Sequence, residues 1–92
     1  MLNELFAVIK DRKARPVEGS YTNRLLSEGE DKILKKLGEE AIEVIVAAKG
    51  QGDQRIVEEM ADLMYHALAL LVTRGISLAD VEAELQRRHI KR

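Results

Sequence analysis

The fold is decided by the stretch KKLGEEAIEVIVAAKGQGDQRIVEEMADLMYH, residues 35–66. Apolar residues recur in it every three or four positions on both sides of a glycine-rich turn at residues 50–53, which is the spacing of two amphipathic helices. A connection this short makes consecutive helices antiparallel neighbours. We therefore expect a helical hairpin at the centre of the fold.

Four carboxylates form two pairs in this hairpin, Glu40 with Glu43 and Glu59 with Asp62. Residues three apart share a helix face, where like charges cost a helix roughly 0.2 to 0.5 kcal/mol per pair. The two pairs can converge in an antiparallel hairpin, and a cation between them would relieve the repulsion. Carboxylates without imidazole or thiolate suit Mg²⁺ or Mn²⁺, ions that usually bridge to substrate phosphates. The pairs thus predict a divalent metal site for phosphate chemistry.

The segments that flank the hairpin also have helical patterns. Apolar residues at helical spacing predict a first helix that ends near Arg15, because Pro16 and Gly19 follow. A loop is then expected, and it carries residues 20–22. The chain before the hairpin is therefore predicted to hold one helix and one loop.

Capping residues set the expected bounds of the later helices. Ser27 followed by Glu30 reads as a capping box that opens the first hairpin helix. Asp53 is expected to cap the second hairpin helix, and Gly75 to end it. A last helix is predicted over residues 77–88, with Ser77 as its cap. The prediction is one all-α domain, residues 1–92, with four main helices around a central antiparallel hairpin.

Composition agrees with a packed helical domain. Of the 92 residues, 46% are hydrophobic, 34% are charged and 3% are aromatic, which suits helices with solvated outer faces. The chain has no cysteine, so a disulfide framework and thiolate metal sites are excluded. With no signal-peptide pattern and no membrane-length apolar span, we expect a soluble, cytoplasmic protein without a membrane partner. A net charge of −1 argues against nucleic-acid binding.

The second hairpin helix indicates a homodimer. Residues 60–72 are apolar almost all round, apart from Asp62, Tyr65 and His66, whereas a surface helix has a polar face. A domain this small buries only about 60 to 65% of the surface of its unfolded chain. A second copy is therefore expected to cover part of this helix, with twofold symmetry as the commonest arrangement.

Further polar residues are candidates for contact with phosphates. Lys35 and Lys36 lie about one turn before Glu40, where they could meet phosphates, although they could equally form a solvated basic face. Tyr21 offers a ring for stacking, and its sequence neighbours Ser20 and Thr22 offer hydroxyl groups for hydrogen bonds. Residues 20–22 are therefore predicted, like the two lysines, to contribute to substrate binding.

Three segments together resemble the phosphoribosyl-ATP pyrophosphohydrolase family, which belongs to the MazG-like all-α nucleotide pyrophosphohydrolases. They are SYTNRL (Ser20–Leu25), KKLGEEAIE (Lys35–Glu43) and EMADLMYH (Glu59–His66). The resemblance covers about residues 2–88. It implies Mg²⁺-dependent hydrolysis of phosphoribosyl-ATP, an ATP-derived nucleotide, to phosphoribosyl-AMP and pyrophosphate in histidine biosynthesis, by a helical homodimer.

The resemblance also implies roles for individual residues. Glu39 would orient water or support the metal site, and Glu43 is the other candidate to direct the water. Lys35 and Lys36 would contact phosphates, and residues 20–22 would face the substrate. The implied metal ligands are Glu40, Glu43, Glu59 and Asp62. Any link to the enzyme of the following step is expected to be non-covalent.

Three alternatives stay open at this point. A di-iron site would need Glu-x-x-His pairs, whereas His66 lies four residues after Asp62; His66 could instead carry protons or be a buried hydrogen-bonded residue. A related enzyme could hydrolyse non-canonical or deoxynucleoside triphosphates. A dimeric interaction module with merely solvated acids would not be an enzyme at all.

Overall fold

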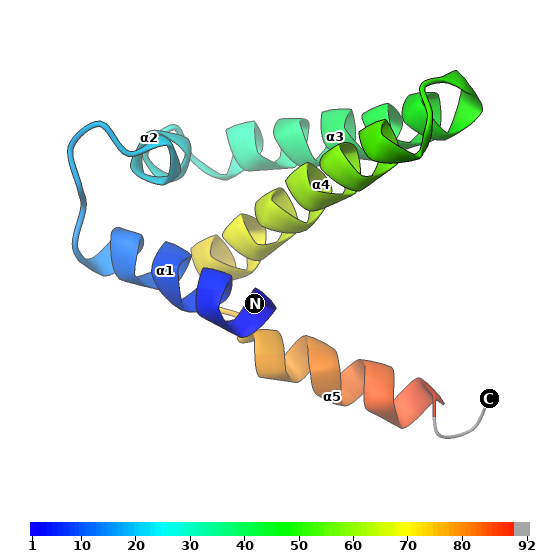
Figure 1. The fold of residues 1–92 in the computed structure, drawn as a ribbon. Coiled ribbons are helices and arrows are strands. Elements are labelled where there is room, and N and C mark those ends of the chain that lie inside the picture. The colour runs from blue at the N-terminus through cyan, green and yellow to red at the C-terminus, as the bar shows by residue number, and fades with distance from the viewer. Residues whose placement is uncertain (90–92) are drawn as a thin grey trace.

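Residues 1–89 are described in a computed structural model, and within them the chain is all helical (Figure 1). This confirms the predicted fold class. The four expected helices are present, and a short additional helix lies between the first two. The helices are α1 (Leu2–Ala14), α2 (Tyr21–Ser27), α3 (Glu30–Gly50), α4 (Asp53–Arg74) and α5 (Leu78–His89).

The antiparallel hairpin of α3 and α4 is the largest feature of the fold, and these helices make the most extensive interhelical contact (Figure 1). The connection turns at Gly52, whose φ of 89° lies in the region that favours glycine. Gly75 ends α4 in the left-handed conformation, and its N–H donates to the Val72 carbonyl. The predicted hairpin and its glycine stop are therefore confirmed.

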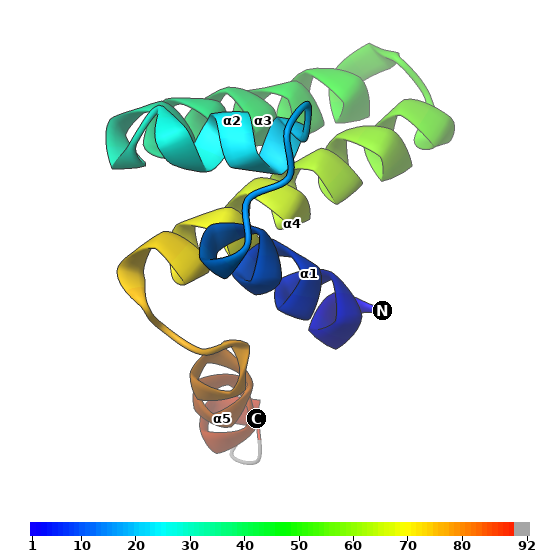
Figure 2. The same cartoon turned by 90° about the vertical axis from the view of Figure 1, so that its left-hand side faces the viewer.

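The hydrophobic core lies where α1 and α2 meet the hairpin. Figure 2 shows α1 crossing the C-terminal half of α4, and Figure 1 shows α2 nearly end-on beside the N-terminal end of α3. The three largest fully buried side chains come from three different helices, and this ties α1, α2 and α3 to a common centre. The buried cluster consists of Ile9, Leu25, Ile33, Leu68, Ala69, Val72 and Leu78.

The segment before the hairpin differs from the prediction. Residues 20–22 were expected in a loop, but Ser20 caps α2 by accepting a hydrogen bond from the Asn23 N–H at 3.3 Å. The predicted capping box at Ser27 and Glu30 is wrong, because the Ser27 hydroxyl donates to the Arg24 carbonyl instead. α2 has only seven residues. A helix of two turns is too short to show a clear apolar period.

The starts of the hairpin helices also differ in detail. Gly29 precedes α3 and Gly52 precedes α4 as the N-cap residues, and neither has a capping side chain. Asp53 is thus the first residue of α4 and not its cap, although its charge still favours the helix N-terminus. For α5, by contrast, the Ser77 hydroxyl accepts from the Asp80 N–H at 3.1 Å, as predicted.

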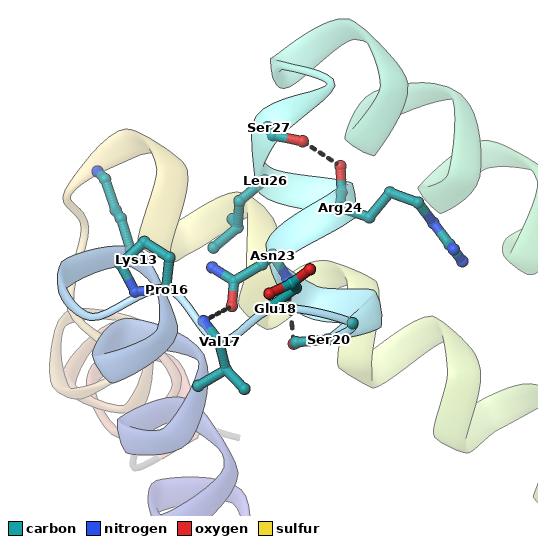
Figure 3. Close-up of a pocket in the computed structure, with 10 residues that line it drawn as sticks. Lys13, Pro16, Val17, Glu18, Ser20, Asn23, Arg24, Leu26 and Ser27 are labelled. Atoms are coloured by element: carbon teal, nitrogen blue, oxygen red, sulfur yellow. Dashed lines mark hydrogen bonds between the residues drawn. The ribbon is translucent and has the colours of Figure 1, made fainter.

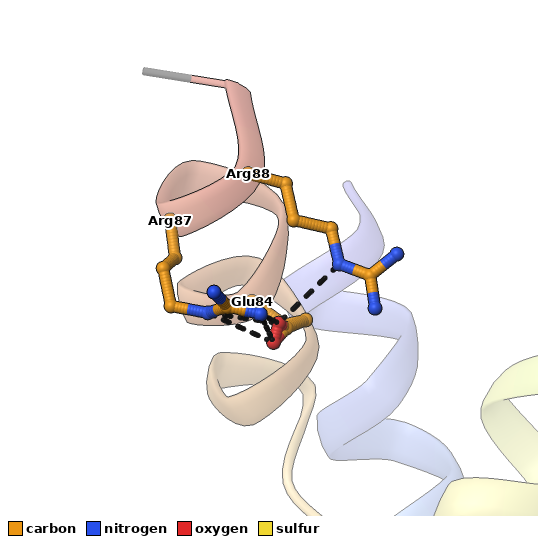
Figure 4. Close-up of polar contacts among 3 residues, drawn as sticks. All are labelled: Glu84, Arg87 and Arg88. Carbon is orange, nitrogen blue, oxygen red and sulfur yellow. Dashed lines mark hydrogen bonds and ion pairs between the residues drawn. The ribbon is translucent and has the colours of Figure 1, made fainter. Parts of the chain in front are cut away.

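Helix α5 extends away from the other helices and makes few contacts with them (Figure 1). Leu78 at its start is buried in the core. Farther along, Glu84 pairs with Arg87 at 2.5 Å and with Arg88 at 3.4 Å (Figure 4). Such pairs support a helix locally by roughly 0.2 to 0.5 kcal/mol each. Within residues 1–89, no helix has the length and apolar character to cross a bilayer.

Candidate active site

Three of the four predicted acidic ligands converge between α3 and α4. Each of Glu40, Glu43 and Glu59 places a carboxylate oxygen within 4.8 Å of the other two. Glu40 and Glu43 lie one turn apart on α3, and Glu59 faces them from the antiparallel helix. The hairpin therefore brings together side chains that lie up to 19 positions apart in the sequence.

Two of these carboxylates are buried. Glu40 is 6% exposed and Glu59 is 4% exposed, whereas Glu43 is exposed at the rim. The carboxylate of Glu43 and burial together raise the pKa of Glu59, since both disfavour its charged form. Crowded, buried acids of this kind are costly unless a cation is near. The site is thus electrostatically suited to a positive ion.

The carboxylate oxygens offer free ligand positions. The Oε2 atoms of Glu40 and Glu59 are buried and have no hydrogen-bond partner within the described residues. Buried polar atoms normally have hydrogen-bond partners, so two unpaired carboxylate oxygens in one acidic group indicate a binding site for a ligand. Oxygen donors alone match Mg²⁺ or Mn²⁺. The residues present therefore fit such an ion.

Basic side chains border the acids on both helices. Arg55 lies one turn before Glu59 and donates from Nη2 to its Oε1 at 2.5 Å. On α3, Lys36 Nζ lies 3.6 Å from Glu40 Oε1. Burial lowers the pKa of Lys36, but the neighbouring Tyr21, Glu40 and Glu39 side chains outweigh burial and raise that pKa overall. Lys36 is therefore a firmly charged neighbour of the acidic group.

Asp62 and Glu39 lie outside the converging group. Asp62 follows Glu59 by three residues on α4 and is exposed. Glu39 is also exposed, and its position next to Glu40 turns it about 100° around α3. Their predicted roles, as a fourth ligand and as a group that orients water, stay predictions.

Helix α2 is attached to α4 beside the site through hydroxyl and imidazole groups. His66 Nδ1 lies 2.7 Å from the Asp62 carbonyl, which can only accept, so Nδ1 carries a proton. In the neutral ring, Nε2 then accepts from the Tyr21 hydroxyl at 3.1 Å. The hydroxyls of Thr22 and Tyr65 are also hydrogen-bonded to each other. His66 is therefore buried and hydrogen-bonded, which is one of the two roles that the sequence left open for it, the other being a proton carrier.

The other predicted substrate residues lie at different places. Ser20 uses its hydroxyl as the cap of α2, and Lys35 is exposed on α3. Sequence reasoning overlooked Arg55, which contacts Glu59, and Arg24, which lines a groove together with Lys36. The contact of Arg55 with Glu59 could have been predicted, because Arg55 stands four residues before Glu59 on the same predicted helix. Arg24 had no such signal, since its segment was assigned no helix.

A cavity of about 810 Å³ lies between the end of α1 and α2 (Figure 3). Its polar groups are largely used within the protein. Asn23 accepts from the Val17 N–H at 2.7 Å and donates to the Arg12 carbonyl at 2.7 Å, while Lys13 donates to the Val72 carbonyl. Figure 3 shows the guanidinium of Arg24 pointing away from this cavity. These contacts fix the connection between α1 and α2.

Comparison with known proteins identifies relatives that match almost the whole chain. A phosphoribosyl-ATP pyrophosphatase from Listeria welshimeri is 56% identical over 91 residues, which cover 99% of this chain and 87% of the relative. The enzyme of that name from Lactiplantibacillus plantarum is 54% identical over 98% of this chain and 85% of its own length.

A longer relative matches as well. The histidine biosynthesis bifunctional protein HisIE from Caldanaerobacter subterraneus is 54% identical over 99% of this chain, and the match spans 44% of that protein. The family model described as phosphoribosyl-ATP pyrophosphohydrolase matches residues 2–89. This chain therefore belongs to the phosphoribosyl-ATP pyrophosphohydrolase family.

Proposed function

We propose that this protein hydrolyses phosphoribosyl-ATP to phosphoribosyl-AMP and pyrophosphate in histidine biosynthesis. The observation that carries the proposal is the buried acidic group of Glu40, Glu43 and Glu59, whose two orphaned oxygens suit a metal that binds phosphates. The substrate is supported by the family and by the names of the relatives.

The acidic group would hold Mg²⁺, or Mn²⁺, with Asp62 as the proposed fourth ligand. When bound, the ion would neutralise phosphate charge and polarise the anhydride that is cleaved. Arg55 keeps Glu59 oriented through its 2.5 Å contact, and the Lys36 ammonium offers a charge for a phosphate oxygen. Together these residues would place a triphosphate across the two hairpin helices.

In the proposed reaction, water adds to a phosphorus of the α–β anhydride, the P–O bond breaks, and pyrophosphate leaves. A carboxylate must take the proton that the water loses. Glu43 is the better placed of the two predicted groups, because it is exposed at the rim yet belongs to the acidic group. Glu39 would support it from the neighbouring face of α3.

The proposed substrate is tested by measuring pyrophosphate release from phosphoribosyl-ATP beside a panel of deoxynucleoside and non-canonical nucleoside triphosphates. We expect kcat/KM to be highest for phosphoribosyl-ATP and to depend on added Mg²⁺. A preference for a free deoxynucleotide would instead assign the protein a house-cleaning role. If pyrophosphate is released from none of these substrates, the remaining alternative is a non-catalytic helical interaction module.

We also propose that two copies associate through the hairpin. Apolar side chains are exposed along both helices, among them Ile42, Ile45 and Val57 at 62% each. Monomers seldom expose extended apolar patches. The Cα radius of gyration of 14.5 Å also exceeds the value of about 12 Å expected for a compact chain of this length. A second copy on this face would supply the missing cover.

The association is tested by substituting aspartate for Ile45. Because a charge buried in an apolar interface is costly, we expect sedimentation to show a dimer for the unmodified protein and a monomer for Ile45→Asp at micromolar concentration. Val8→Asp places the same charge on α1, where Val8 is 47% exposed, and should stay dimeric. A compact monomer of the unmodified protein would contradict the proposal.

A link to the next enzyme of the pathway is a further part of the proposed function. Two relatives are bifunctional histidine biosynthesis proteins, and the segments that match this chain span 44% and 43% of their lengths. We propose that this chain associates non-covalently with the protein that performs the other activity.

A further inference from the structure

A second, cationic groove lies next to the acidic group. It has a volume of about 170 Å³ and is formed by one face of α2 and the first turns of α3. Whole small-molecule ligands usually occupy pockets of about 300 to 1,000 Å³, so this groove fits only part of a nucleotide. Its lining includes three cationic residues and one carboxylate, and consists of Tyr21, Arg24, Leu25, Glu28, Lys32 and Lys36.

The cations of this groove are available for an anionic ligand. Arg24 has no carboxylate within 4.0 Å among residues 1–89, and its guanidinium lies 5.4 Å from the centroid of the Tyr21 ring. Lys32 lies 3.7 Å from Glu28 in an exposed pair, and such pairs contribute little. A phosphate could therefore engage Arg24 and Lys32 without breaking a strong internal contact.

The groove continues directly into the acidic group. Lys32, Lys36 and Glu40 follow one another at intervals of four residues, so they line one face of α3 at steps of about 6 Å along its axis. Lys36 lines the groove and also contacts Glu40. A polyphosphate whose cleaved bond lies at the acids would thus extend its far end past Lys36 toward Arg24 and Lys32.

We propose that this groove binds the pyrophosphate end of the substrate, that is, the β and γ phosphates that leave as product. This inference rests on the proposed function. The groove supplies positive charge where negative charge accumulates as the anhydride breaks, and it adds Arg24 and Lys32 to the residues that bind substrate. Glu28 opposes the ligand and sets the strength of product binding.

The experiment measures binding of inorganic pyrophosphate directly by calorimetry, with and without Mg²⁺, so that it does not depend on turnover. We expect Arg24→Gln and Lys32→Gln each to weaken binding about tenfold, the scale of one charge-assisted hydrogen bond. Glu28→Gln should tighten it, because Lys32 loses its competing partner. Lys49→Gln removes a charge at the far end of α3 and should bind like the unmodified protein.

The outcomes separate the groove from the proposed reaction. Unchanged pyrophosphate binding in both Arg24→Gln and Lys32→Gln, with normal melting curves, would overturn the groove even if phosphoribosyl-ATP is hydrolysed. Weakened binding in a protein that releases no pyrophosphate from phosphoribosyl-ATP would support the groove and overturn the proposed function. A raised KM for phosphoribosyl-ATP with unchanged pyrophosphate binding would assign the groove to the ribosyl phosphate and reject our assignment.

Discussion

Substituting Glu40 or Glu59 with glutamine should abolish most of the pyrophosphohydrolase activity while the protein stays folded. Each substitution removes a charge from the acidic group and leaves an amide of nearly equal size. We expect kcat/KM to fall roughly 100-fold or more, the scale seen when one pre-organised electrostatic group is lost. Thermal melting in EDTA should be unchanged or raised, because repulsion among the three carboxylates is relieved.

The same variants test whether the acids bind the metal, independently of activity. An ion that binds only the folded state stabilises it by mass action, by about 2.7 kcal/mol at 100 times its dissociation constant. The melting temperature of the unmodified protein should therefore rise with Mg²⁺, and that of Glu40→Gln should rise far less. Glu82→Gln, an exposed acid on α5, is the matched control and should respond like the unmodified protein. A full Mg²⁺ response in both active-site variants would refute the ligand assignment.

Sequence periodicity predicted the hairpin because its signals are local and strong. Helices of 21 and 22 residues give many turns over which an apolar stripe repeats, and Gly75 marks the end of α4 unambiguously. The acidic pairs were visible because three-residue spacing fixes a shared helix face. Because the short turn makes α3 and α4 antiparallel neighbours, their acidic faces were expected to meet. Glu40, Glu43 and Glu59 do converge.

Other features depend on contacts that no local pattern encodes. The short α2 is kept in place by Leu25 in the core and by the Tyr21–His66 and Thr22–Tyr65 hydrogen bonds, each between residues more than 40 positions apart. Asp62 has the spacing of a ligand, but its side chain lies outside the converging group. Spacing identifies a face of a helix, whereas the crossing of two helices decides which turns of that face meet.

Truncating Ile33 should destabilise the domain more than truncating exposed apolar residues. Ile33 is fully buried in the cluster that joins α1, α2 and the hairpin, so Ile33→Ala should lower the free energy of unfolding by about 2 to 5 kcal/mol. Urea titration at fixed protein concentration measures the loss, and Val8→Ala, on the exposed side of α1, should stay within about 0.5 kcal/mol. Because Ile33 precedes Lys36 and Glu40 on α3, partial unfolding should also weaken Mg²⁺ binding at temperatures where the control still binds. Equal midpoints for the two variants would contradict a central place for Ile33 in the hydrophobic core.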